Sequence, residues 1–178
     1  MPEVSARQIS FDWPPFYREL ATKLLPYRNR QAELLALLDK LRAQDIPVTP
    51  CTDMDAQGRK FPLEEMDPFT FYGTFNRGVA KKVRLAILGA MKEKFQVQAP
   101  LPTDFQGIPI LNNQKLWFFG YKAHRKPDDI NRLWEVFAQA LGPDPLSDAA
   151  FAQAFDRAME VKQVSANLTV ALYWIRPD

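Results

Sequence analysis

The sequence predicts a mainly α fold, a compact multi-helix domain, and three observations support this prediction. Apolar residues recur at helical spacing in several segments. An N-capping residue or a proline stands before most of these segments. The candidates for β-strands are confined to two irregular connections and one short segment that follows the second of them. The length of 178 residues suits a single domain, and a hydrophobic fraction of 47% is enough for one sizeable core.

The N-terminal part of the predicted domain is a helical hairpin over residues 11–44. A first helix is expected over 11–27, with Asp12 as its N-cap and two prolines in its first turn. A second helix is expected over 30–44 after Asn29, because its leucines form one apolar stripe. The hairpin is predicted to pack on the helical core that follows.

That helical core is predicted over residues 67–176. Asp67 followed by Pro68 is a strong helix-start signal. The two irregular connections cover 45–65 and 98–114, where prolines stand among polar residues. The apolar and aromatic segment after them, 116–121, is expected to be a strand or an extended loop. The core helices are predicted over residues 69–75, 79–95, 130–141, 148–161 and 168–175.

The residues that most catalytic sites require are scarce in this chain. There is no glycine-rich phosphate loop followed by lysine and serine or threonine, so we expect no nucleotide hydrolysis by these residues. The single histidine, His124, lies in a basic run with no acid to orient it, which argues against a catalytic triad. One histidine and one cysteine are too few for a structural zinc site. We therefore expect a binding domain and no enzyme, metal or cofactor.

The chain also lacks the features of exported or membrane proteins. Cys51 is the only cysteine, so no internal disulfide can form and a reducing compartment is the simpler interpretation. The first residues contain no apolar core of a signal peptide. No apolar run approaches the roughly 18 residues of a membrane span. A cytoplasmic location is expected.

Positive charge is concentrated in the middle third of the chain. Residues 77–132 contain eleven Lys or Arg and four Asp or Glu, a net charge of +7, whereas the remainder holds twelve and seventeen, a net charge of −5. A basic block inside a slightly acidic protein favours a polyanion, or an acidic surface of another protein, as the partner. A solvated basic face without a partner is the open alternative.

Two segments within this block combine residue types that bind nucleic acids. At the start of helix 79–95, free backbone N–H groups and nearby cations form a phosphate site, unless those side chains only extend into water. Segment 105–122 adds side-chain amides that can read base edges and aromatic faces that can stack on bases. The same aromatics could instead belong to the core. The predicted phosphate contacts are Arg77, Lys81, Lys82, Lys115, Lys122, Arg125 and Lys126, and the predicted base contacts are Asn76, Asn112, Asn113, Trp117 and Tyr121.

Five segments of the chain are distinctive when taken in order: FDWPPFYRELATKLL (11–25), DPFTFYGTFNRG (67–78), FQGIPILNNQKLWFFGYK (105–122), KPDDINRLWEVF (126–137) and NLTVALYWIRPD (167–178). Together they resemble the N-terminal region of McrB-like AAA+ restriction proteins. The resemblance implies a DNA-recognition domain that often reads a methylated or otherwise modified base. It also implies a motor that uses GTP or ATP with Mg, whose motifs are absent from these residues, and an McrC-like nuclease as partner. The better-known domain that flips methylcytosine looks different.

The predicted function is therefore the DNA-binding specificity module of an McrB-like restriction system. Double-stranded DNA carrying a modified base is the expected ligand, and these residues alone are expected to be monomeric. The alternative is a protein-interaction module that docks onto the motor, a partner nuclease or a phage protein. An enzyme that acts on a flipped nucleotide is less consistent with the missing catalytic groups.

Overall fold

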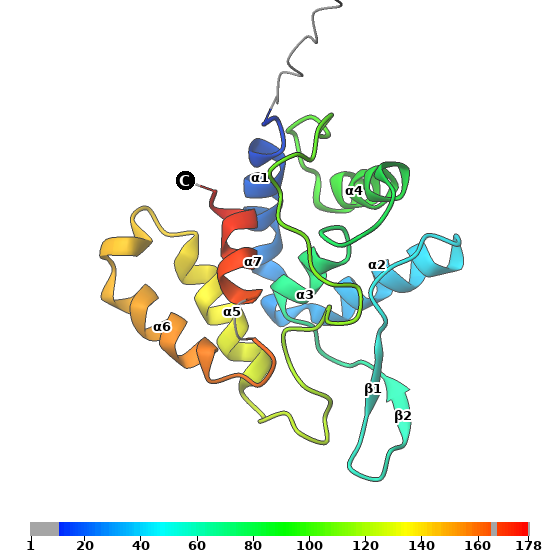
Figure 1. The fold of residues 1–178 in the computed structure, drawn as a ribbon, viewed down its shortest axis with the longest axis vertical. Coiled ribbons are helices and arrows are strands. Elements are labelled where there is room, and N and C mark those ends of the chain that lie inside the picture. The colour runs from blue at the N-terminus through cyan, green and yellow to red at the C-terminus, as the bar shows by residue number, and fades with distance from the viewer. Residues whose placement is uncertain (1–10, 165–166, 178) are drawn as a thin grey trace, which may run out of the picture.

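A computed structural model describes residues 11–164 and 167–177, and in this part the fold is mainly helical, as predicted. Figure 1 shows α3 at the centre, α4 and α6 on opposite sides of the view, and a small hairpin that projects away from the helices. The elements are α1 (Pro14–Leu24), the 3-10 helix η1 (Leu25–Asn29), α2 (Gln31–Ala43), β1 (Thr52–Met54), β2 (Lys60–Pro62), α3 (Pro68–Gly73), α4 (Lys81–Phe95), α5 (Asp129–Ala140), η2 (Pro145–Ser147), α6 (Ala149–Met159) and α7 (Asn167–Ile175). Of these, α1 packs on α4 and α7, and α3 packs on α5 and α7.

The N-terminal helices form where the apolar spacing predicts them, but their expected caps are wrong. Trp13 occupies the N-cap position of α1 and makes no side-chain cap. The carboxylate of Asp12 instead accepts hydrogen bonds from the backbone N–H groups of Thr103 (2.8 Å) and Asp104 (3.2 Å). Asp12 therefore ties the second irregular connection to the start of α1. Asn29 ends η1, so it does not cap α2.

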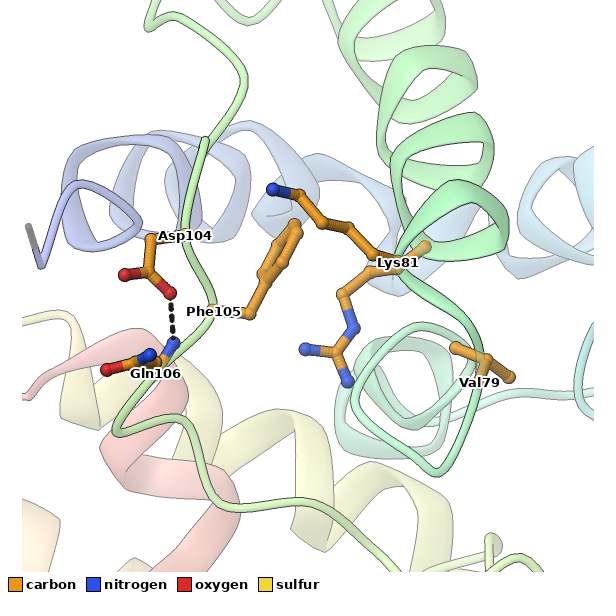
Figure 2. Close-up of a pocket in the computed structure, with 6 residues that line it drawn as sticks. Val79, Lys81, Asp104, Phe105 and Gln106 are labelled. Atoms are coloured by element: carbon orange, nitrogen blue, oxygen red, sulfur yellow. Dashed lines mark hydrogen bonds between the residues drawn. The ribbon is translucent and has the colours of Figure 1, made fainter. Parts of the chain in front are cut away.

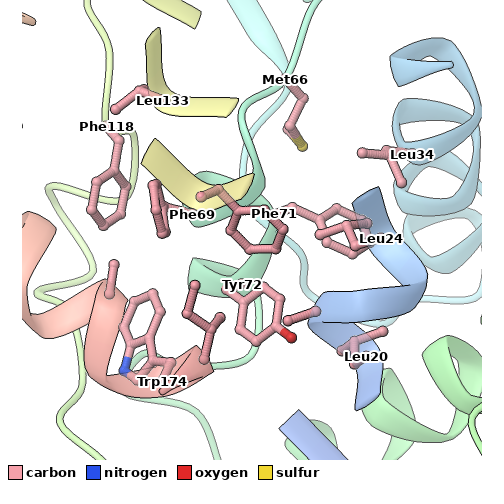
Figure 3. Close-up of a cluster of buried hydrophobic side chains, with 14 of the residues drawn as sticks. Leu20, Leu24, Leu34, Met66, Phe69, Phe71, Tyr72, Phe118, Leu133 and Trp174 are labelled. Atoms are coloured by element: carbon pink, nitrogen blue, oxygen red, sulfur yellow. The ribbon is translucent and has the colours of Figure 1, made fainter. Parts of the chain in front are cut away.

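The short central helix α3 begins as its sequence predicts. The Asp67 carboxylate accepts hydrogen bonds from Phe69 N–H (2.8 Å) and Thr70 N–H (3.0 Å), and Pro68 occupies the first helical position. All six residues of α3 are buried. Figure 3 shows that side chains of α3 meet those of α1, α5 and α7, and the rings of Tyr72 and Trp174 stack with centroids 6.4 Å apart. The aromatic content of this segment thus builds the core.

Only one of the two irregular connections carries paired strands among the described residues. β1 and β2 form an antiparallel hairpin in which Thr52 lies opposite Pro62. The second connection contributes an isolated parallel bridge between Leu111 and Arg77. Segment 116–121 is an extended loop, because Phe118 N–H donates to the Thr70 hydroxyl (2.9 Å) instead of joining a strand.

The remaining helices end near their predicted limits. Helix α6 is predicted to begin at residue 148, and Asp148 instead caps it by accepting a hydrogen bond from Ala150 N–H (2.8 Å). The observed limits of α4, α5 and α7 agree with the predicted ones to within two residues at either end. None of the helices in the described part of the chain combines the length and the hydropathy of a membrane span.

Candidate nucleic-acid interface

Much of the positive charge in residues 77–132 is neutralised within the fold. Within residues 11–164 and 167–177, four of its eleven cations have a carboxylate partner. These ion pairs are Lys94–Glu33 (3.1 Å), Lys122–Glu64 (3.5 Å), Arg125–Asp53 (2.8 Å) and Arg132 with both Asp128 (2.7 Å) and Glu160 (2.6 Å). The surface field of this block is therefore weaker than its sequence charge of +7 indicates.

The side chain of Arg125, a predicted phosphate contact, has a structural role. Its guanidinium donates to Asp53 (2.8 Å) and to the Gly120 carbonyl (3.0 Å), and it lies 5.1 Å from the centroid of the Phe119 ring. The Arg125 side chain is only 8% exposed. The prediction that Arg125 holds a DNA phosphate is therefore corrected, because its charge is already paired inside the protein.

The side chains of Asn76 and Arg77, two further predicted contacts, also bond within the protein. Asn76 is fully buried, and its side-chain oxygen accepts a hydrogen bond from the Tyr17 hydroxyl (2.7 Å), so it cannot contact a base directly. Arg77 is half-buried and donates to the carbonyls of Thr74 (3.2 Å) and Pro47 (2.9 Å). Burial lowers the pKa of Arg77 from its ordinary value. These two residues join α3 to the loops around it. The buried Asn76 is not retained as a base contact, whereas the phosphate contact predicted for the half-buried Arg77 stays a prediction.

Four of the predicted residues line a single pocket of about 620 Å³, which we call the aromatic pocket. They are Asn113, Lys115, Trp117 and Tyr121, all from the segment singled out for base recognition. Tyr121 is 42% exposed. Its ring meets that of Trp117 edge-on, with centroids 5.4 Å apart. One cation, one amide and two aromatic side chains of segment 105–122 thus line the same pocket.

The wall of the aromatic pocket is held in place by the hairpin and the loop before it. The indole N–H of Trp117 donates to the Pro50 carbonyl (2.9 Å), which fixes the orientation of the ring. At the base of the hairpin, Asp53 accepts hydrogen bonds from the N–H groups of Lys122 and Met54, both at 2.8 Å. Burial raises the pKa of Asp53, but these hydrogen bonds and the Arg125 guanidinium outweigh burial and lower it overall. An ionised Asp53 therefore anchors the segment after Tyr121.

The pocket also contains residues that sequence reasoning did not select as a site. Gln163 and Asn167 reach it from the far end of the chain, and the remaining lining residues are Pro50, Thr52, Leu116, Phe119 and, from the segment singled out for base recognition, Gln114. Asn167 is the first residue of α7, and nothing in the local sequence of Gln163 or Asn167 indicates a site. Their positions follow from the packing of α7 on the core, which no short motif records.

The other predicted contact residues lie outside this pocket. Lys82, Lys122 and Lys126 are exposed. Asn112 is exposed as well, and its side-chain oxygen accepts a hydrogen bond from Gln114 N–H (2.9 Å) within a turn. Lys81 lines a second, smaller pocket at the start of α4.

The donor set of the aromatic pocket suits a planar, hydrogen-bonding ligand. Its volume lies in the range of roughly 300–1,000 Å³ that small-molecule sites occupy. Aromatic faces can stack on a ring, amides can pair with its edge, and an ammonium group can meet an adjoining phosphate. In the described residues, no group of three or more His, Cys, Asp or Glu is placed to hold a metal ion.

Comparison with known proteins identifies the family without a function. A search of curated proteins and a search of solved structures both found no match. A family model described as "Domain of unknown function (DUF8425)" matches residues 13–178, which is nearly the whole chain. The chain belongs to this family of domains of unknown function.

Proposed function

We propose that this chain is the DNA-binding specificity module of an McrB-like restriction system and that its aromatic pocket accepts a modified base. One observation carries the proposal. The pocket collects Asn113, Lys115, Trp117 and Tyr121, a third of the residues that the sequence singled out for DNA, with the amides of three further residues around them. The resemblance of five segments to McrB-like proteins supports the DNA part of the proposal.

A base in this pocket would have left the DNA stack. Extrusion of a base requires a few kcal/mol of unstacking and unpairing free energy. Stacking on an aromatic side chain returns about 1–3 kcal/mol per base. Tyr121 is the exposed ring available for stacking, and Lys115 can hold the phosphate next to the extruded base. Added methyl groups on the base would enlarge its contact with Trp117 and Tyr121.

The test measures the binding of labelled duplexes that differ only in one base. Fluorescence anisotropy reports the binding at two salt concentrations. The duplexes carry cytosine, methylcytosine, hydroxymethylcytosine or methyladenine. We expect one modified duplex to bind more tightly than the unmodified one and all affinities to fall with salt. Equal affinity for every duplex would reject the modified-base part of the proposal, and no binding at low salt would reject the DNA part.

A matched pair of tyrosine variants then locates the site. Tyr121→Ala removes an exposed ring from the pocket, whereas Tyr173→Ala removes an exposed ring on α7 that packs against Trp13. We expect the first variant to lose the preference for the modified duplex and the second to keep it. Loss in neither variant would show that the base is read elsewhere.

The protein-interaction module stays a second candidate because of the internal ion pairs. Four cations of the basic block are already neutralised, which leaves less charge for a polyanion than the sequence indicates. A partner protein needs less charge than DNA and more complementary surface. The absence of DNA binding at low salt would favour this candidate.

A further inference from the structure

The first turn of α4 contains a buried cation with few partners. Arg84 is 7% exposed, and its guanidinium lies 4.7 Å from the centroid of the Phe105 ring. Its Nη2 donates to the Arg77 carbonyl (3.1 Å), whereas its Nε is buried with no hydrogen-bond partner. A guanidinium carries five N–H donors, so a single carbonyl leaves most of its capacity unused.

The charge of Arg84 is also uncompensated. Within residues 11–164 and 167–177, no carboxylate lies at ion-pair distance from it, in contrast to Arg125 and Arg132. Burial lowers the pKa of Arg84 from its ordinary value, and the nearby Tyr17 offsets this only in part. Buried charges in proteins are normally paired, because removing an ion from water is costly. Arg84 is therefore placed as an anion-binding group would be.

Arg84 lines the second pocket, which has a volume of about 300 Å³ and which we call the Arg84 pocket. Figure 2 shows Lys81 and Phe105 on facing sides of this space, with Asp104 and Gln106 beyond the Phe105 ring. The remaining lining residue is Val79. Lys81 and Arg84, from one turn of α4, thus face the loop that carries the Gln106 amide.

The backbone at this place adds further unpaired donors. Helix α4 has 15 residues, and its N-cap, Ala80, has no side chain that could accept a hydrogen bond. No acid stands in the first turn, which instead begins with Lys81 and Lys82. The first N–H groups of the helix and its dipole therefore favour an anion here.

The loop wall of the pocket is fixed by contacts with α4 and with the residues that precede α1. The Lys81 ammonium donates to the Thr103 carbonyl (2.6 Å), and Asp12 accepts from the Thr103 N–H (2.8 Å). Gly107 turns the chain with a φ of +78°, and a Cβ there would stand 2.8 Å from the Phe11 ring. The pocket is therefore part of the packed structure of the domain.

We propose that the Arg84 pocket binds a phosphate group. A tetrahedral oxyanion matches the forked donors of Arg84, the Lys81 ammonium and the N–H groups of α4. The Asp104 carboxylate opposes it, but its single charge is exceeded by the two cations and the helix dipole. The Arg84 pocket shares no lining residue with the aromatic pocket, so phosphate binding here does not depend on base recognition there. The phosphate can come from a DNA backbone or from a free phosphate ion.

The first experiment titrates the intact protein with inorganic phosphate at constant ionic strength, with chloride as the balancing ion. Two readouts are followed, the thermal midpoint Tm and the NMR signal of the Arg84 Nε–Hε pair. We expect a saturable rise in Tm and a saturable shift of the Arg84 signal. A Tm that follows ionic strength alone, with an Arg84 signal that does not move, would overturn the proposal.

Variants separate the pocket from general charge effects. Arg84→Met keeps a long unbranched side chain without the charge, and Lys82→Ala removes an exposed cation from the same turn outside the pocket. We expect the phosphate response to be lost in Arg84→Met and retained in Lys82→Ala. Equal loss in both variants would overturn the proposal. If Arg84→Met does not fold, the Nε–Hε signal of the wild-type protein still tests the proposal, because it shifts only if phosphate binds beside Arg84.

The source of the phosphate is tested by competition with unmodified duplex DNA. If phosphate weakens DNA binding more than chloride at equal ionic strength, the pocket holds a backbone phosphate. If phosphate saturates the pocket without affecting DNA binding, the pocket takes a free phosphate. Both outcomes support the Arg84 site and identify its source. If the protein fails to bind DNA yet responds to phosphate through Arg84, the proposed function fails and this inference stands.

Discussion

The Arg125 guanidinium lies 2.8 Å from the Asp53 carboxylate, and the two side chains are only 8% and 1% exposed. Asp53 lies on β1, and Arg125 follows the extended loop that lines the aromatic pocket. This ion pair therefore joins the hairpin to the candidate site across 72 positions of sequence. Loss of this ion pair should therefore lower the stability of the fold more than it lowers the affinity for DNA.

Replacing Arg125 by Met should destabilise the domain. The substitution leaves Asp53 buried without its charge partner, for which a destabilisation of about 3 kcal/mol or more is usual. Chemical denaturation measures this change, with Lys126→Met as the exposed control. The Asp53→Asn and Arg125→Met double variant should recover part of the loss, because it removes both charges. A stable Arg125→Met variant with weakened DNA binding would restore the role that the sequence predicts for Arg125.

The stability of the domain should depend on the protonation of Asp67. Burial raises the pKa of Asp67 from 3.8 to about 6, despite the hydrogen bonds from Thr70 and Phe69 that lower it. The folded state therefore binds this proton more tightly than the unfolded chain. The resulting stabilisation is full below about pH 4 and is lost as the pH rises through about 6.

Asp67→Asn isolates this effect, since asparagine keeps an oxygen that can cap α3. The free energy of unfolding of the wild type, minus that of the variant, should fall between about pH 4 and 7 by at most about 3 kcal/mol. Denaturation at several pH values measures it. A difference that stays constant or rises over this range would contradict the assigned direction of the shift.

Local signals in the sequence predict most helices of this fold because their causes are local. The apolar stripe of α5 and the Asp67–Pro68 pair act within a few residues of their own position. Asp12 shows the limit of such reasoning. It stands where a helix cap is expected, but its carboxylate bonds to Thr103, 91 positions away. A sequence shows which groups need partners, but it does not show which distant group will meet them.

The candidate site was predictable only in part for the same reason. Trp117 and Tyr121 reach a pocket, as their charged neighbourhood indicates, whereas Asn76 and Arg125 find partners inside the protein. The unusual position of Arg84, by contrast, is visible in the sequence. It stands in register with Leu88 and Met91 on the buried stripe of α4, and a cation in such a stripe calls for an explanation.

Two exposed lysines, one that lines the aromatic pocket and one outside it, should contribute to DNA affinity without contributing to specificity. Lys115 and Lys126 are exposed, and no ion pair to a described carboxylate neutralises them. Replacing either by Ala should weaken binding to all duplexes alike and reduce the slope of log K against log salt by about 1. Lys94→Ala, which removes a cation paired with Glu33, is the control and should leave the slope unchanged. An effect confined to one duplex would instead place the lysine at the base.

The Asp104 carboxylate should weaken the proposed phosphate site. It lines the Arg84 pocket and accepts a hydrogen bond from Gln106 N–H at 2.8 Å. Asp104→Asn keeps an acceptor for that bond and removes the negative charge, so phosphate should bind a few-fold more tightly. Asp144→Asn, at the start of η2 and outside the pocket, is the control for net charge. Titration followed by Tm measures both variants at constant ionic strength. An equal gain in both would mean that phosphate responds to net charge, whereas a gain in Asp104→Asn alone would place the anion beside residue 104.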